Sequence, residues 1–161
     1  MNPAVHVLVF EGFADWEPAY ALAELRRSGG LDVVTLGFTD APVRSMGGLR
    51  VVPDRAMAEL RAREVPIAAI CGATLALAHA GLLNDRAHTS NEQAYLTSLA
   101  PEYAGGGRYV DTLAVRDRGV ITASGLGPTE FAREIFEELE VFTAEERPVW
   151  YHLFKHGRFP Q

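Results

Sequence analysis

The sequence predicts an α/β fold with a doubly wound, mostly parallel sheet sandwiched by helices. Short apolar runs alternate with segments of helical pattern along the chain, and this alternation favours parallel strands joined by helices. Several runs, such as residues 5–10 and 120–124, are apolar almost throughout, which is typical of strands covered on both faces. A length of 161 residues predicts a single domain over residues 1–161.

The first half of the chain is expected to hold two strands, a hairpin and two helices. Asp15 is placed as the N-cap of the first helix, and Glu17 and Pro18 follow in its first turn, where acids and proline are favoured. A glycine pair between two short β-patterned arms indicates the hairpin. The expected ranges are 5–10 (strand), 19–27 (helix), 31–37 (strand), 42–54 (hairpin) and 57–63 (short helix).

The second half repeats the alternation of strands and helices. Gly81 is expected to stop one helix, and Ser90 or Asn91 to cap the next, which closes near Leu99. After Pro128, four apolar residues at helical spacing form the inner stripe of an amphipathic helix. The other expected ranges are 65–70 (strand), 72–80 (helix), 109–115 (strand), 120–124 (strand) and 144–155 (helix).

The single cysteine, Cys71, lies where the strand over residues 65–70 turns into a helix. A sulfur at a helix N-terminus faces unpaired backbone N–H groups and the positive end of the helix dipole, which favour a thiolate. Small residues around it, among them Gly72 and Ala73, suit a sharp strand–nucleophile–helix elbow. The alternative from this pattern alone is a buried, unreactive cysteine that only packs.

Composition narrows the possible partners and compartments. The net charge of −6 and the absence of a dense basic patch argue against nucleic acid and anionic membranes as partners. One cysteine forms no internal disulfide, so we expect the cytoplasm. No apolar run approaches the roughly 20 residues of a membrane helix. No His, Cys, Asp and Glu set has metal-site spacing, so we expect neither a metal nor a cofactor.

Four stretches give the chain a family resemblance that spans nearly its whole length. They are residues 12–17 (GFADWE), 67–83 around Cys71, 88–91 (HTSN), and 122–132. Together and in this order they resemble the ThiJ/PfpI superfamily, also called class I glutamine amidotransferase-like. The resemblance implies a flavodoxin-like fold and a homodimer that acts on a small-molecule substrate.

The same resemblance implies roles for Cys71, Glu17 and Gly72, and three further residues are site candidates, of which His88 also fits a purely structural role. Cys71 resembles the elbow nucleophile, and Glu17 the acid that the first loop points at the thiol. Gly72 resembles the residue whose N–H helps form the oxyanion hole. Asp15 corresponds to the acid of hydratase-like relatives, although it also fits as a helix cap. We expect Thr74 and His88, with Gly72 and Asp15, to line the oxyanion hole or the pocket.

The chain departs from the family pattern in two respects. Protease-like members carry a histidine directly after the elbow cysteine, where this chain has Gly72; other members supply one at the position of Arg108. Peptide and glutamine hydrolysis therefore lack an assigned base. A strand–helix unit also appears missing between about residues 55 and 65. Either the protein lacks this unit, or the sequence at hand omits a segment.

These observations leave three hypotheses for the function. The first is a cysteine-dependent enzyme whose thiolate adds to a small carbonyl or amide electrophile, with Glu17 moving the proton. The second is a non-catalytic redox or stress sensor in which Cys71 oxidises. The third is an unreactive scaffold.

Overall fold

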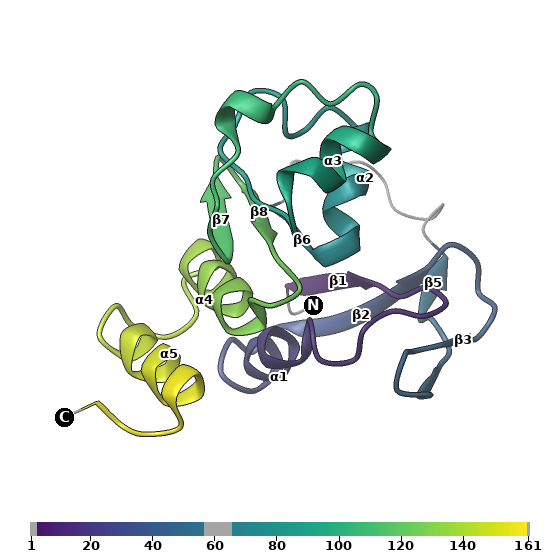
Figure 1. Ribbon diagram of the computed structural model, residues 1–161. Helices are drawn as coiled ribbons and strands as arrows, with labels where there is room; N and C mark the ends of the chain where they lie inside the picture. Colours follow the sequence, from purple (N-terminus) through teal and green to yellow (C-terminus); the bar gives the residue numbers. More distant parts are fainter. Residues whose placement is uncertain (1–2, 57–65, 161) are drawn as a thin grey trace. The chain divides into compact units, whose positions relative to one another are not determined.

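The computed structural model describes residues 3–56 and 66–160 of the chain (Figure 1). These residues form two compact units, one that ends at residue 64 and one that begins at residue 65. The short helix expected over residues 57–63 lies outside the described residues.

The first unit is built on a three-stranded parallel sheet in the order β1-β2-β5. Strand β1 (Ala4–Leu8) leads into helix α1 (Ala19–Arg27), which returns the chain to β2 (Asp32–Gly37) beside β1. Leu25 of α1 is buried. Both strands and the helix lie within one or two residues of the expected ranges.

A hairpin and a very short strand complete this unit. Strands β3 (Val43–Arg44) and β4 (Arg50–Val51) pair antiparallel, so the predicted hairpin is confirmed. Strand β5 (Arg55–Ala56) was not predicted, because two residues carry no β pattern of their own. It is held by the preceding Asp54, whose carboxylate accepts hydrogen bonds from the backbone N–H and the hydroxyl of Thr35 in β2.

The predicted helix cap at Asp15 is wrong. Helix α1 begins at Ala19 with Pro18 at its N-cap position, and no side chain bonds there to the helix N–H groups. The Asp15 carboxylate instead accepts the N–H of Gly47 in the hairpin, at 2.6 Å. An N-cap side chain reaches only the N–H groups two or three residues after it, and Asp15 lies too far upstream of the helix to reach them.

The second unit is built on a sheet in the order β6-β8-β7. Strand β6 (Ile67–Ile70) is parallel to β8 (Val120–Ala123), and β7 (Ala114–Asp117) is antiparallel to β8. The two-residue turn from β7 to β8 has positive φ angles at Arg118 and Gly119, as a type I′ hairpin turn requires.

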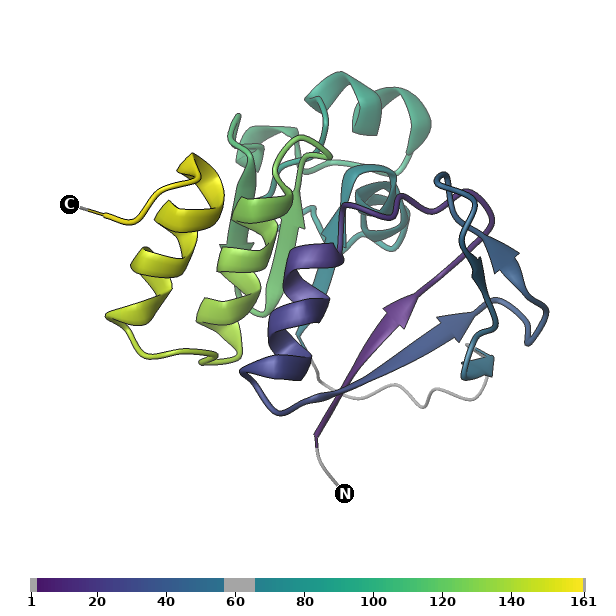
Figure 2. The same cartoon turned by 90° about the horizontal axis from the view of Figure 1, so that it is seen from below.

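Helices flank this sheet and cover its parallel strands. Helix α4 packs on β7 and β8, and α5 packs on α4, as Figure 2 shows. Helices α2 and α3 contact each other and enclose a cluster of buried apolar side chains that includes Leu77, Leu83 and Leu96. The helices are η2 (Cys71–Ala73), α2 (Thr74–His79), α3 (Gln93–Leu99), η3 (Gly106–Arg108), α4 (Pro128–Glu138) and α5 (Glu146–His156).

Two predictions for this unit need correction. The strand expected over residues 109–115 begins only at Ala114, because the N–H of Thr112 bonds to the carbonyl of Val110 in a tight turn. The expected cap at Ser90 or Asn91 is also wrong, since α3 has Glu92 at its N-cap position and no side-chain cap. Ser90 bonds instead to Thr74, and Asn91 bonds to Cys71 and Gly125.

Candidate functional site

Cys71 lies at the turn between β6 and helix α2, where the sequence predicts an elbow. Ile70 before it is extended, and Cys71 itself has a φ of 55°. This left-handed conformation is unfavourable for a residue with a Cβ atom and persists only where the surroundings enforce it. The thiol is partly exposed. The turn thus presents a reachable sulfur on a backbone that is held away from its preferred conformation.

Within the second unit, the sulfur is hydrogen-bonded by the side chain of Asn91. Its Nδ2 donates to Cys71 Sγ at 3.2 Å, and its Oδ1 accepts the N–H of Gly125 at 2.9 Å. Gly125 belongs to the loop between β8 and α4. One amide therefore links the thiol to a loop that follows the neighbouring parallel strand.

A set of buried hydroxyl groups lies behind the thiol. Thr74 is fully buried, and its Oγ1 donates to the carbonyl of Cys71 at 2.6 Å and lies 2.8 Å from Ser90 Oγ. Thr89 is also fully buried: its backbone N–H donates to the hydroxyl oxygen of Thr122, and its own hydroxyl donates to the carbonyl of Thr112. The predicted pocket residue Thr74 thus supports the elbow from below.

His88 is fully buried at the start of the same segment. Its Nδ1 lies 2.9 Å from the carbonyl oxygen of Arg86, and its Nε2 lies 2.6 Å from the hydroxyl of Tyr103. Burial lowers the pKa of His88, against a smaller opposing effect of the Arg86 carbonyl. Both ring nitrogens are occupied, so this geometry holds the ring in place and gives it no free nitrogen to act as a base.

Gly72 follows the thiol and is exposed. A Cβ atom added at Gly72 would meet the hydroxyl of Tyr95 at 3.7 Å, an ordinary contact distance. A side chain would therefore fit in the available space. The role expected for Gly72 depends on its backbone N–H, which stays a prediction.

The two acidic candidates lie in the first unit. The hydroxyl of Ser45 and the N–H of Gly47 lower the pKa of Asp15, although burial opposes them. Glu17 is partly buried between Trp16 and the start of α1. Cys71 belongs to the second unit, so the pairing of Glu17 with the thiol stays a prediction. What the second unit itself brings together is Cys71, Thr74, Ser90 and Asn91.

Asn91 and Gly125 are the contacts that the sequence interpretation missed. The sequence predicts a helix cap at Ser90 or Asn91 and no contact between Asn91 and the thiol. One signal was available in the sequence. Asn91 directly follows residues 88–90, and the loop that contains Gly125 follows the strand over residues 120–124. Carboxyl ends of parallel strands meet at one edge of a sheet, where ligands bind in α/β folds.

Comparisons with known proteins identify the family. A statistical description of the DJ-1/PfpI family matches residues 3–65 and residues 59–138. The chain belongs to the DJ-1/PfpI family. A curated relative from Bacillus subtilis, called the uncharacterized protease YoaZ, is 34% identical, with 94% of this chain and 90% of the relative covered.

Two solved structures of the DJ-1/PfpI family confirm the α/β fold class. A thiJ/pfpI family protein from Bacillus anthracis has a TM-score of 0.91 at 32% identity and covers 98% of this chain and 92% of its own. The DJ-1 superfamily protein Atu0886 from Agrobacterium tumefaciens has a TM-score of 0.86 at 32% identity, with 98% of this chain and 100% of its own covered.

The alignment with YoaZ is longer than this chain. It extends over 189 positions, whereas the chain has 161 residues, so it includes positions at which the relative has residues and this chain has none. The two stretches that match the DJ-1/PfpI family meet at residues 59–65. The strand–helix unit expected to be missing near residues 55–65 stays a prediction.

Two further properties of the described residues bear on the site. In residues 3–56 and 66–160, no three His, Cys, Asp or Glu side chains are grouped so that they could hold a metal ion. No helix in these ranges is both long and apolar enough to cross a bilayer.

Proposed function

We propose that the protein is a cysteine-dependent enzyme that acts on a small carbonyl compound through the thiolate of Cys71. The observation that carries this proposal is the partly exposed sulfur on a left-handed turn, held by an amide donor. An N–H that donates to sulfur interacts more strongly with the thiolate than with the thiol, and the thiolate is the nucleophile.

The reaction begins with attack of the sulfur lone pair on the carbonyl carbon. A C–S bond forms, the π electrons of the carbonyl move to its oxygen, and the oxyanion takes up a proton to give a hemithioacetal. In this proposal the backbone N–H of Gly72 faces the oxyanion and Glu17 supplies the proton. Asp15, Thr74 and His88 shape the surroundings rather than exchange protons.

A carbonyl substrate fits the described residues better than a peptide does. Addition to an aldehyde requires one proton at the new oxyanion, whereas amide cleavage also requires a proton for the departing amine. The usual donor for that second proton is a histidine. His88, the histidine expected at the site, has both of its ring nitrogens already bonded. The proposal therefore ranks carbonyl chemistry above the proteolysis named for the relative.

The compartment and the oligomeric state of the enzyme are further parts of the proposed function. A lone, reachable thiol suits a reducing compartment, so we propose the cytoplasm. We likewise propose a homodimer, because the family resemblance implies one.

The direct test is turnover of methylglyoxal by the wild-type protein and by Cys71→Ser and Glu17→Gln. Both substitutions should reduce turnover at least about tenfold, because the proposal assigns the nucleophile to Cys71 and the proton donor to Glu17. Glu11→Gln is the matched control: it lies in the same loop, and its carboxylate accepts the N–H of Arg44, which a glutamine oxygen also accepts. This control should retain turnover.

Other outcomes would contradict the proposal. Turnover that survives in Cys71→Ser excludes the thiol as nucleophile. Conversion of Cys71 to sulfinate by peroxide without turnover of methylglyoxal, an isonitrile or a peptide would instead favour a redox sensor.

A further inference from the structure

We infer that Asn91 is a positioning residue for Cys71: its side-chain amide orients the sulfur and stabilises the thiolate. This inference rests on the function proposed above, because it assigns a role at the same nucleophile. It concerns contacts made entirely within the second unit.

The orientation of the Asn91 amide follows from its two partners. The N–H of Gly125 can only donate, so the atom 2.9 Å from it must be the carbonyl oxygen of the amide. The NH2 group then necessarily points to Cys71 Sγ, 3.2 Å away. A flipped amide would place its NH2 group against the N–H of Gly125 and would turn its oxygen towards the sulfur, where it repels a thiolate.

The segment before Asn91 is held unusually firmly for a loop. His88, Thr89 and Ser90 are all at most 2% exposed. Each makes a side-chain hydrogen bond to a different part of the unit, namely to Tyr103, to the carbonyl of Thr112 and to Thr74. Thr74 in turn bonds to the carbonyl of Cys71. The backbone that presents the amide and the backbone that presents the thiol are therefore tied to the same hydroxyl.

Within this unit, the Asn91 amide donates a hydrogen bond directly to the sulfur. The hydroxyl of Tyr95 lies 3.7 Å from where a Cβ on Gly72 would lie. Glu92 follows Asn91 in the chain and is exposed. Removal of the amide N–H should therefore act on the thiolate directly.

The test measures how the rate of alkylation by iodoacetamide depends on pH, since only the thiolate reacts. Asn91→Ala removes the donor without adding charge. Asn91→Asp keeps an oxygen for the N–H of Gly125, and so keeps the loop contact, but replaces the donor with a negative group. Loss of one charge-assisted hydrogen bond should move the midpoint upward by about one pH unit, or about tenfold slower alkylation below both midpoints.

Asn84→Asp is the matched control. Asn84 lies beyond the other end of α2, and its Oδ1 accepts the N–H of Ala104 at 2.8 Å, as Asn91 Oδ1 accepts that of Gly125. Asn84→Asp adds the same negative charge to the same unit, but it removes no hydrogen-bond donor from the thiol. Its alkylation profile should match that of the wild-type protein. A midpoint that stays unchanged in both Asn91 variants overturns the inference.

A measurement on the wild-type protein covers the case in which the variants fold poorly. The side-chain NH2 signals of Asn91 in 15N–1H spectra should shift as the thiol titrates and should lose that response after alkylation. Asn91 NH2 signals that do not shift as the thiol titrates contradict the inference. Neither readout needs turnover, so a failed methylglyoxal assay with a responsive Asn91 would reject the proposed reaction and leave the positioning role established.

Discussion

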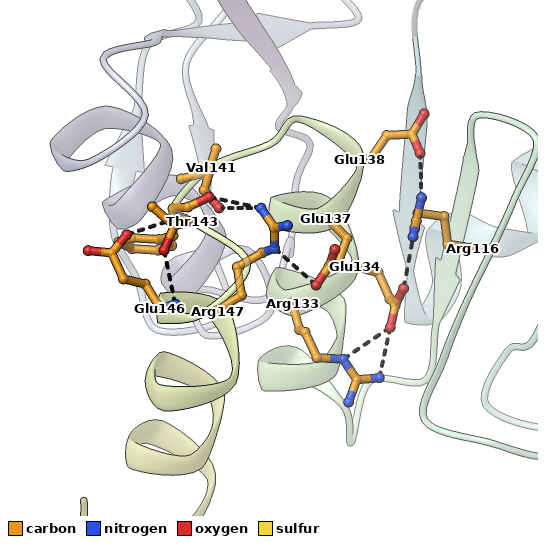
Figure 3. A network of polar contacts seen from close by, with 10 residues as sticks. Arg116, Arg133, Glu134, Glu137, Glu138, Val141, Thr143, Glu146 and Arg147 are labelled. Carbon is orange, nitrogen blue, oxygen red and sulfur yellow. Dashed lines mark hydrogen bonds and ion pairs between the residues drawn. The ribbon is translucent and has the colours of Figure 1, made fainter. Parts of the chain in front are cut away.

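Two polar networks hold the second unit together, and they differ in almost every physical property. Behind Cys71, hydroxyl groups of Thr74, Ser90 and Thr89 are buried and neutral. Around α4, Arg116 and Arg147 form charged contacts near the surface (Figure 3). The buried network fixes a turn and a short segment, whereas the charged network joins whole elements. The neutral network therefore positions the groups near the thiol, and the charged network holds the strand and the helices around it together.

The charged network joins β7, α4 and α5. Arg116 of β7 pairs with Glu134 and Glu138 of α4, and Arg147 of α5 pairs with Glu137. At the start of α5, Thr143 and Glu146 exchange side-chain and backbone hydrogen bonds, as in a capping box (Figure 3). Arg116 keeps contact with water, so its pairs contribute modestly and salt weakens them.

The largest expected effect comes from Thr74→Val. The valine keeps the shape of threonine but leaves the carbonyl of Cys71 and the hydroxyl of Ser90 without this partner in a dry environment. The free energy of unfolding, measured by urea denaturation, should fall by about 2–4 kcal/mol. The matched control is Thr97→Val, whose exposed hydroxyl bonds only to the carbonyl of Gln93 one turn earlier; it should change stability by less than about 0.5 kcal/mol.

A smaller effect should appear when the pH is lowered through the range in which histidine titrates. Burial lowers the pKa of His88 in the folded protein. Below about pH 6.5 the His88 ring is therefore protonated in the unfolded chain while it is still neutral in the folded protein. Stability should therefore fall as the pH drops from about 6.5 through the folded pKa, by at most about 1.4 kcal/mol per pH unit, and level off below it.

Unfolding curves of the wild-type protein and of His88→Gln between pH 7.5 and about 5 measure this effect. The glutamine variant should lose the part of the slope that His88 contributes. The same slope in both proteins would show that protonation of His88 does not change the free energy of unfolding in this range.

The smallest expected effect comes from Arg116→Gln in the charged network. The Arg116 side chain is 37% exposed, so loss of its two ion pairs should cost only about 0.2–1 kcal/mol. The difference from the wild-type protein should shrink between low and high salt, whereas that of Thr74→Val should persist. An Arg116→Gln effect as large as that of Thr74→Val would remove the distinction between the two networks.

The sequence predicts those parts of the fold whose signal is local. The helix over residues 19–27 and the strand over 120–124 have clear periodicity and lie where the structure has α1 and β8. The turn at Cys71 was also predicted, because small residues and the change from a strand pattern to a helix pattern mark it.

The errors concern short polar side chains that bond far along the chain. Asp15 and Asn91 were both assigned to helix caps, yet Asp15 bonds to Gly47 and Asn91 to Cys71 and Gly125. A cap and a long-range acceptor or donor have the same residue types. Only the order of strands in the sheet decides between them, and that order is a property of the whole fold.

The left-handed turn at residue 71 sets stability against chemistry at one position. Glycine adopts a φ of 55° without the crowding that a Cβ atom creates, so the backbone here would be more relaxed with glycine in place of the thiol. The chain therefore carries its sulfur where a residue with no side chain would suit the backbone better. Directed evolution of this protein for thermal tolerance alone would be expected to discard Cys71 and, with it, the proposed reactivity.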